Sequence, residues 1–345
     1  WQVKDAFDVR QHIDGVRGVE SQLGGRVTRL MAALEELQVP VGAARDALGI
    51  AGEGEEVSRN FREKGRMKTL FDRAGVPCAR HAQVASTDAA VAFASAVGFP
   101  LVVKPPAGAG AKATFCVNDL KELREALAVH RPREGNEALL EEFVIGNEHS
   151  FETISIDGRT VWHSLSHYFP TPLEVVQTPW IQWCVLVPRE ADHPRYDDIR
   201  ATAAKALTAL GMGTGLTHME WFRRRDGSLA ISEVAMRPPG AHIVTLHSYA
   251  HDFDLSDAWA RLMVFGTFDA PARRYACGAA FFRGQGEGRV AAVHGVDSAQ
   301  RAVSELGVEI VEHRLPLRGQ AKSSGYEGEG YAIVRHPQTS VVQEA

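Results

Sequence analysis

The sequence predicts an α+β protein of about two to three domains, and three features of its 345 residues support that class. Residues 1–75 carry helical periodicity, short strands and helices alternate from residue 76, and strands crowd between residues 151 and 235. The dipeptides Asp157-Gly158 and Asp226-Gly227 separate successive strands, as hairpin turns do. The expected fold therefore combines helices with strands that are partly linked as hairpins.

Composition and charge exclude several classes of protein. Hydrophobic residues make up 45% of the chain and charged residues 23%, which are ordinary values for a globular protein. A formal net charge of −5 argues against nucleic acid and against a membrane surface as partners. No apolar run approaches the ~20 residues that a membrane span needs. We therefore expect small-molecule partners, and a homodimer remains open.

The cysteines and the first residues favour a cytoplasmic location. Cys78, Cys116, Cys184 and Cys277 are widely separated, and no two form a CxxC pair. This spacing indicates neither a zinc site nor a disulfide framework, and reduced thiols are typical of a cytoplasmic protein. The residues after Trp1 carry charges and lack the apolar core of a signal peptide. We expect that the natural start, with part of a domain, precedes Trp1.

Residues 1–75 are expected to form a helical region, the end of a truncated domain. The expected helices cover residues 18–37, 43–48 and 59–74. A polar linker is expected at residues 52–56. Pro40 is expected to stop the first helical pattern, and Gly75 is a typical C-terminal cap for the last helix.

Residues 76–143 are expected to form a small α+β unit of the size of a lid subdomain. Its expected strands cover residues 101–104, 114–117 and 138–144, and its expected helices cover residues 88–97 and 120–129. Ser86 or Thr87 suits the N-terminal cap of the first helix, and Asn118 or Asp119 suits that of the second.

Residues 144–345 are expected to form a larger lobe with a strand-rich C-terminal part. Its expected strands cover residues 151–156, 159–166, 181–187, 215–222 and 229–234, its expected helices cover residues 196–210 and 255–264, and short strands joined by Gly-rich turns fill residues 276–334.

The most informative part of this lobe is the hairpin around Asp226-Gly227. A two-residue type I′ turn there places Glu220 directly opposite Glu233. Like charges repel across a strand pair, so this arrangement favours a bridging cation, and oxygen ligands alone favour Mg²⁺ or Mn²⁺. An exposed hairpin whose acids pair with the arginines at residues 223–225 is the alternative.

The same face of the hairpin is expected to carry His218 and Ala235, followed by Arg237. A guanidinium group suits phosphate, so Arg237 is a candidate phosphate ligand. His218 is expected to pack or to contact substrate, since imidazole is a poor ligand for Mg²⁺.

Two lysines are candidates for phosphate binding. Lys104 ends an apolar strand and opens a loop of small residues that includes Gly108 and Gly110. Backbone N–H groups in such a loop can approach an anion while the ammonium group neutralises it, although an ordinary flexible loop explains the same pattern. Lys64 lies on a predicted helix and is either a second phosphate ligand or a solvated lysine.

Taken in order, these features resemble the ATP-grasp superfamily, in particular its biotin-carboxylase-like amino acid ligases. The order is a basic helix, a strand with a lysine and a small-residue loop, the segment LLEEFVIGNE, a strand-rich stretch, and a paired-glutamate hairpin ending in Arg and Gly. The resemblance covers roughly residues 59 to 265. It implies an ATP-grasp fold in which two α+β lobes clasp ATP beside a partial N-terminal domain.

The resemblance also implies roles for individual residues. The positions that match ATP-binding residues of the family are Lys64, Lys104, Gly108, Gly110, Glu141, Glu142, Val144 and Glu148. The lysines and loop glycines would contact the phosphates, the residues from Glu141 to Val144 would hold the adenine, and Glu148 would face the ribose. Glu220 and Glu233 match the metal-bridging acids, and Arg237 matches the arginine near the transferred phosphate. Ala235 departs from the family pattern, which often has a metal-binding Asn there.

The implied reaction is the ATP-dependent joining of a carboxylate to an amine through an acyl phosphate, with release of ADP and phosphate. Tyr168, Trp180 and Trp183 either line the acceptor pocket or pack structurally, and Gly240 and Ala241 could offer backbone N–H groups to a substrate carboxylate. Two alternatives remain: a subunit of a biotin-dependent carboxylase, and a nucleotide-binding module that has lost catalysis.

Overall fold

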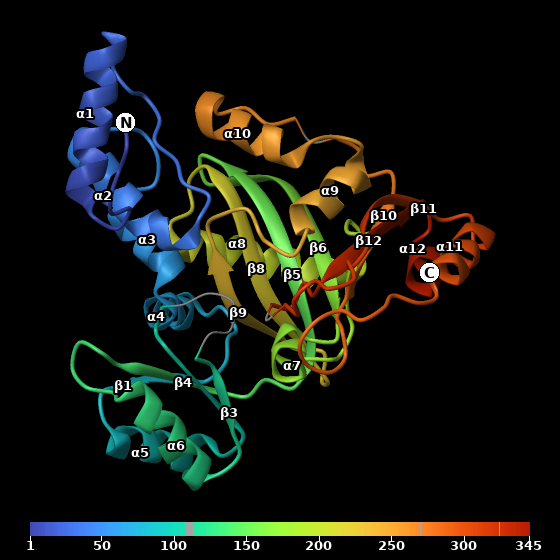
Figure 1. Ribbon diagram of the computed structural model, residues 1–345. Coiled ribbons are helices and arrows are strands. Elements are labelled where there is room, and N and C mark those ends of the chain that lie inside the picture. Colours follow the sequence, from blue (N-terminus) through green and yellow to red (C-terminus); the bar gives the residue numbers. More distant parts are fainter. Residues whose placement is uncertain (108–112, 270, 324) are drawn as a thin grey trace.

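The structure is a computed structural model that describes residues 1–107, 113–269, 271–323 and 325–345. Two antiparallel sheets organise the chain (Figure 1). The smaller has the strand order β1-β4-β2-β3 and the larger the order β11-β12-β10-β7-β6-β5-β8-β9. Mixed helices and antiparallel sheets confirm the expected α+β class.

The small sheet consists of β1 (His81–Val84), β2 (Leu101–Lys104), β3 (Phe115–Val117) and β4 (Ala138–Glu142). Helices α5 (Thr87–Val97) and α6 (Leu120–His130) pack together against it. The Ser86 side chain accepts a hydrogen bond from the backbone N–H of Ala89, and Asp119 caps α6 in the same way. Both expected helices, with caps at these positions, are therefore confirmed.

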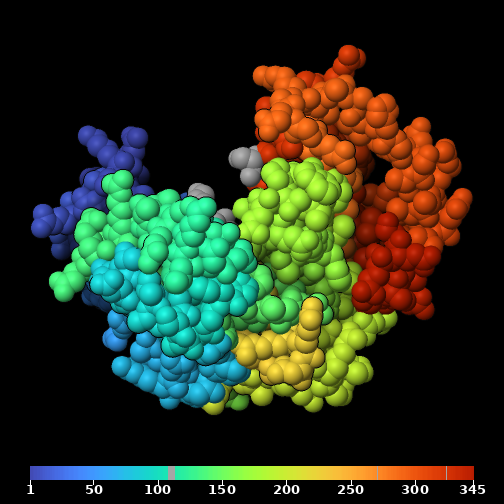
Figure 2. Space-filling model, turned by 90° about the horizontal axis from the view of Figure 1, so that it is seen from below, coloured from blue at the N-terminus to red at the C-terminus, as the bar shows by residue number. Residues whose placement is uncertain are grey.

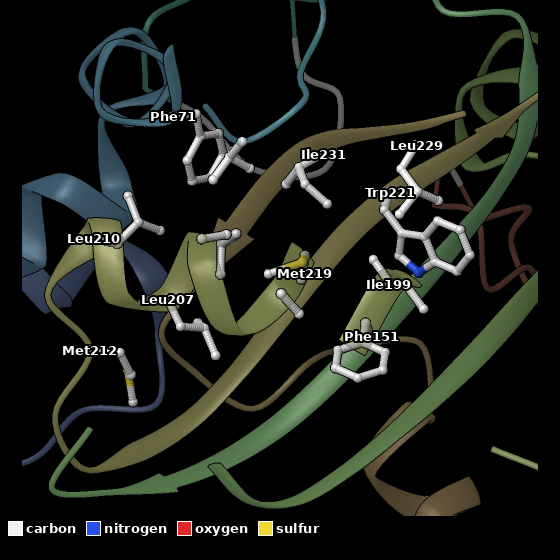
Figure 3. Packing of buried hydrophobic residues seen from close by; sticks show 14 of the residues in the cluster. Phe71, Phe151, Ile199, Leu207, Leu210, Met212, Met219, Trp221, Leu229 and Ile231 are labelled. Carbon is white, nitrogen blue, oxygen red and sulfur yellow. The ribbon is translucent and has the colours of Figure 1, made fainter. Parts of the chain in front are cut away.

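The large sheet consists of β5 (Gly146–Ile156), β6 (Arg159–Phe169), β7 (Trp183–Val187), β8 (Gly215–Arg224), β9 (Leu229–Ala235), β10 (Ala276–Phe282), β11 (Glu309–Arg314) and β12 (Gly330–His336). One face of its β5, β8 and β9 strands packs on α8 (Asp197–Leu210) and α4 (Lys64–Ala74). Figure 3 shows part of this core, in which Trp221, Met219 and Ile231 from the hairpin meet Phe71 and Leu207 from the helices.

Alternation along the strands sends the polar residues of the same three strands to the opposite face. That face carries Glu148 and Glu152 from β5, His218 and Glu220 from β8, and Glu233 from β9. Helices α9 (Ile243–His251) and α10 (Leu255–Phe265) cover part of this face. The sequence predicted α10 and did not predict α9.

The remaining helices are α1 (Val9–Leu23), α2 (Gln38–Leu48), α3 (Glu55–Arg62), α7 (Pro172–Gln177), α11 (Val296–Glu305) and α12 (Thr339–Glu344), with 3-10 turns η1 (Glu35–Leu37) and η2 (Pro194–Tyr196). Helices α7, α11 and α12 were not predicted, and α11 lies within the stretch expected to contain only short strands. No helix in the described parts of the chain combines the length and apolarity needed to cross a bilayer.

The expected N-terminal helices are wrong in detail. The helix predicted over residues 18–37 ends early, because Gly24 adopts the left-handed conformation (φ 63°). Pro40 does not end a helix; it lies in the first turn of α2, where its missing N–H has no intrahelical partner to lose. The helix predicted over residues 59–74 is two helices, separated where Glu63 is extended (φ −92°, ψ 100°).

The hairpin of β8 and β9 pairs Glu220 with Glu233 as expected, although its turn is different. The loop has three residues, since the backbone N–H of Arg224 donates to the carbonyl of Ser228 at 2.9 Å. Positive φ occurs at Gly227 (84°) and not at Asp226, so the turn is not type I′.

A β-bulge restores the predicted register. Trp221 pairs with Ile231 and Glu220 with Glu233, which leaves Ser232 as the extra residue. The bulge also reverses the side-chain alternation, so that Ile231 enters the core while Glu233 reaches the opposite face.

Candidate active site

One cavity of about 490 Å³ lies between the two sheets. Its walls come from the ends of β2 and β4, the polar face of β5, β8 and β9, helix α7, and the segments around Gly240 and Tyr326. Figure 2 shows the hollow between the blue-green small sheet and the yellow-green segment that carries α7. The described residues predicted to bind ATP, metal or phosphate all line this cavity: Lys64, Lys104, Glu141, Glu142, Val144, Glu148, Glu220, Glu233 and Arg237. Gly108 and Gly110 lie outside the described residues.

Glu220 and Glu233 are directly opposite each other on the cavity face. The ammonium group of Lys64 lies 2.6 Å from a carboxylate oxygen of Glu233. Burial raises the pKa of Glu233, but the charges of Lys64 and Lys104 outweigh burial and lower it to about 2. Glu233 is therefore a carboxylate at neutral pH, and Lys64 is its partner rather than a solvated lysine.

Lys104 shares the carboxylate of Glu141 with a second lysine. Its ammonium group lies 2.8 Å from one Glu141 oxygen, and that of Lys68 lies 3.2 Å from the other. Burial lowers the pKa of Lys104, but the charges of Glu141, Glu233 and Glu220 reverse this and hold it above its usual value. The cavity therefore contains a charged lysine that is held in place by a buried acid.

Lys68 was missed by the sequence analysis. Its side chain is 0% exposed, and it sits one helical turn beyond Lys64 on α4. Spacing of four residues puts both lysines on one face of the helix. That spacing, in the string REKGRMK, was the available signal.

Residues 143–145 connect the two sheets, between Glu142 at the end of β4 and Glu148 near the start of β5. The carboxylate of Glu142 pairs with Arg80 and with Arg224, both at 2.6 Å, so it ties the small sheet to the large one. Val144 and its apolar neighbours Phe143 and Ile145 line the cavity. Burial, together with the charges of Glu220 and Glu233, raises the pKa of Glu148 well above its usual value.

A buried network behind the cavity was also missed. Glu152 is fully buried, and its two oxygens accept hydrogen bonds from His218 at 2.7 Å and from His247 at 3.1 Å. Burial lowers the pKa of His218, but its hydrogen bonds to Glu152 and Glu220 raise it to about 9. His218 therefore presents a positive charge to the cavity beside Glu220, at 3.8 Å. His247 comes from α9, so no local pattern in the sequence could reveal this contact.

The predicted acceptor residues divide into two groups. Tyr168, Trp183, Gly240 and Ala241 line the cavity. Trp180 does not line it, and its side chain is 56% exposed.

The acids of the cavity fit a hard divalent cation. Glu220 and Glu233 offer only oxygen, the donor that Mg²⁺ prefers. Burial, and then the negative charges of Glu220 and Glu233, raise the pKa of Glu148, and a cation would offset that negative charge. The three acids do not bring one oxygen each within 4.8 Å of one another. Among the described residues, only Asp72, Cys78 and His81 bring three ligand atoms that close together. Two carboxylates with phosphate oxygens suffice for Mg²⁺.

One family model and several known proteins match this chain. The model of the ATP-grasp domain matches residues 69–252. The chain is 25% identical over 246 residues to an L-arginine-specific L-amino acid ligase of Bacillus subtilis, covering 70% of this chain and 59% of that protein. It is 25% identical over 250 residues to an alanine–anticapsin ligase of Bacillus subtilis, covering 66% of this chain and 52% of that protein. The chain thus spans between half and three fifths of the length of these relatives.

Solved structures share the fold. An L-amino acid ligase from Bacillus licheniformis superposes with a TM-score of 0.77 at 19% identity, covering 98% of this chain and 82% of that one. An N5-carboxyaminoimidazole ribonucleotide synthetase from Thermotoga maritima superposes with a TM-score of 0.68 at 16% identity, covering 99% and 83%. At these identities the similarity establishes the fold alone.

Proposed function

The chain belongs to the ATP-grasp family, and from that premise we propose that it is an ATP-dependent carboxylate–amine ligase. It forms an amide through an acyl phosphate and releases ADP and phosphate. The observation that carries the proposal is the opposition of Glu220 and Glu233 in one cavity with Lys64 and Lys104. Paired acids and clamping lysines are what phosphoryl transfer needs.

ATP lies between the two sheets in this proposal. Lys104 and Lys64 bind phosphate oxygens, and the adenine lies against the apolar segment around Val144. Glu148 faces the ribose. Residues 76–143 act as the lid over the nucleotide, residues 144–345 form the catalytic lobe, and residues 1–75 belong to a further domain.

The cavity's own residues position the phosphoryl group. Glu220 and Glu233 hold Mg²⁺ or Mn²⁺, which when bound neutralises phosphate charge. Arg237 donates hydrogen bonds to the transferred phosphoryl group from a fixed orientation, since Glu35 holds its guanidinium. The charged ring of His218 adds positive charge beside Glu220, opposite Ala235.

The relatives favour amino acids as substrates. Two of them are named for L-amino acid or alanine ligation, and we propose that this chain likewise joins an amino acid to a second small molecule. Tyr168, Trp183 and Tyr326 give one side of the cavity an aromatic wall for the acceptor. Four free cysteines suit a cytoplasmic enzyme.

Nucleotide release tests the proposal. Purified protein is mixed with ATP, Mg²⁺ and amino acids added singly and in pairs, and ADP is measured. The proposal expects ADP release that requires both an acid and an amine, together with a product of the mass of their amide. Release that depends on bicarbonate instead would identify a carboxylase. ATP binding without turnover in any pair would contradict the ligase.

A further inference from the structure

We propose that Asp72, Cys78 and His81 bind one transition-metal ion of the zinc class, at a site outside the ATP cavity. Their carboxylate, thiol and imidazole ligand atoms lie within 4.8 Å of one another, and among the described residues they are the only such group of three. None of the three lines the cavity. The inference is independent of the proposed ligase activity.

The spacing of the three groups already approaches that of metal ligands. One oxygen of Asp72 lies 3.8 Å from Sγ of Cys78, and the other lies 3.7 Å from Nε2 of His81. Tetrahedral zinc with its usual bond lengths separates such ligand atoms by roughly 3.3–3.6 Å. The two distances from Asp72 therefore exceed those of a bound zinc site by only ~0.3–0.4 Å.

The hydrogen bonding of His81 prepares its ring for a metal. Nδ1 lies 3.1 Å from the carbonyl oxygen of Ala79, and a carbonyl only accepts, so Nδ1 carries the hydrogen. In the neutral ring the lone pair is then on Nε2, which faces the carboxylate of Asp72. A positive charge between these two acceptors, either a proton on Nε2 or a metal ion, would satisfy both. A backbone carbonyl that fixes the ring in this way is typical of metal-binding histidines.

The ligand chemistry selects the metal. A thiolate, an imidazole and a carboxylate suit Zn²⁺ or Co²⁺, whereas Mg²⁺ and Ca²⁺ prefer oxygen. Binding converts the Cys78 thiol to a thiolate and releases its proton to solvent. The side chain of Asp72 is 64% exposed and that of His81 is 11% exposed, so the ion enters from the Asp72 side and keeps a water as its fourth ligand.

The position of the site indicates what the ion would stabilise. Asp72 belongs to α4, Cys78 makes a parallel bridge with Ile231 of β9, and His81 pairs with Glu141 of β4. The ion would therefore fasten the segment that passes from α4 across the hairpin to the small sheet. Glu141 is the acid that holds both Lys68 and Lys104, so this segment adjoins the lysine cluster.

Paired cysteines are the usual sequence signal of a zinc site, and this chain has none. The ligands here follow the spacing Asp-x5-Cys-x2-His, which crosses from the end of a helix to the start of a strand. Only the fold brings Asp72 back toward the other two.

Cobalt spectroscopy tests the site without reference to activity. Chelator-treated protein is titrated with Co²⁺ alone, and thiolate-to-cobalt charge-transfer absorption is recorded. The expected result is one equivalent per chain, displaced by Zn²⁺ and not by Mg²⁺. Cys78→Ser should abolish the charge-transfer band, and His81→Gln should weaken affinity at least ~10-fold. The matched control is Cys116→Ser, which removes the half-buried cysteine of β3 and should change nothing.

Two results would overturn the proposal: no charge-transfer band in the wild-type protein, or a band that survives Cys78→Ser. Circular dichroism checks that each variant is folded. If Cys78→Ser does not fold, Asp72→Asn on the exposed side of the site provides the second test. Its Co²⁺ affinity should fall at least ~10-fold with the band retained, and an unchanged affinity would exclude Asp72 from the site and with it the three-ligand proposal.

Discussion

Arg237 donates two hydrogen bonds to a single oxygen of Glu35, from Nε at 3.1 Å and from Nη2 at 2.8 Å. The other Glu35 oxygen accepts from Arg62 at 2.6 Å. Glu35 is only 6% exposed and precedes α2, whereas Arg237 lines the cavity just after β9. The orientation of the cavity arginine therefore depends on a buried acid in the N-terminal helical region.

Replacing Glu35 by Gln should lower ATP turnover by about 10- to 100-fold. The amide is neutral, so whichever of its groups faces Arg237, the charge-assisted hydrogen bond from Arg237 to a carboxylate is lost, at a cost of about 1.5–3 kcal/mol. Steady-state kinetics measure the effect, which should appear mainly in kcat because Arg237 acts on the transferred phosphoryl group in the proposed mechanism. The control is Glu36→Gln, which changes the exposed neighbour. Equal turnover in both variants would show that Glu35 does not position Arg237.

Glu233→Gln should reduce ATP turnover at least ~100-fold, because it removes one of the two opposed carboxylates that we propose as metal ligands. The same change takes from Lys64 a carboxylate partner at 2.6 Å. We therefore expect the melting temperature to fall rather than rise, despite the relief of repulsion with Glu220. Turnover assays and thermal unfolding without metal measure the two effects. Glu125→Gln on the exposed face of α6 is the control. Near-normal turnover would place the metal elsewhere.

The position of the β8–β9 hairpin could be predicted from local sequence, but its turn and its bulge could not. Asp226-Gly227 correctly located the hairpin and led to the pairing of Glu220 with Glu233. The predicted register requires a two-residue turn, and the observed three-residue loop alone would shift the register by one residue. The bulge at Ser232 cancels that shift. A bulge is set by the need to bury Ile231 and expose Glu233 to the cavity, which depends on both faces of the sheet and cannot be read from the loop.

Contacts between distant segments limited the prediction of the site. The strand ending at Lys104 and the cap at Ser86 follow from local patterns, and both were predicted. The partners Glu35 and His247 lie 202 and 95 residues from the residues that they bind. Neither sits in a motif of its own, so only the folded chain brings them to the site.

Lys104→Met should weaken the binding of a non-hydrolysable ATP analogue by about 1.5–3 kcal/mol, since the proposed charge-assisted hydrogen bond to phosphate would be lost. Glu141 retains Lys68 at 3.2 Å, so the buried acid is still paired and the fold should persist. Calorimetric titration in the presence of Mg²⁺ measures the dissociation constant. Lys121→Met, whose side chain is 84% exposed on α6, is the control. An unchanged dissociation constant would remove Lys104 from the phosphate site.

Two neighbouring histidines should make the fold sensitive to mild acid. The Nδ1 atoms of His149 and His167 lie 2.7 Å apart on paired strands. Burial, with the nearby positive charges of His167 and Arg223, lowers the pKa of His149 to about 3, and burial with Arg195 lowers that of His167 to about 4. An unfolded histidine has a pKa of ~6.5. The unfolded chain therefore binds more protons, and stability present above pH 6.5 is lost as the pH falls toward these values.

As the pH falls from roughly 6.5 to 5, protonation of each histidine in the unfolded chain should lower the free energy of unfolding by up to about 1.5 kcal/mol. Urea unfolding at several pH values measures the loss. His149→Gln removes one titrating ring, so the slope of stability against pH should be shallower in that variant. His313→Gln changes an exposed histidine on β11 and should leave the slope as it is. Parallel slopes for wild type and His149→Gln would contradict the assignment.

The last prediction concerns the reaction intermediate. The cavity places Glu220, Glu233, Arg237 and Lys104 around one space, and these groups stabilise charge on phosphoryl oxygens. Such a site favours transfer of the terminal phosphoryl group of ATP to the substrate carboxylate. Attack by the amine then breaks the bond between carbonyl carbon and oxygen, so one carboxylate oxygen leaves with the phosphate. When the acid substrate carries ¹⁸O in its carboxylate, mass spectrometry should find the label in inorganic phosphate. The Glu233→Gln variant should give no labelled phosphate above background. Label in AMP would mean that an adenylate forms instead, and the acyl phosphate route would be wrong.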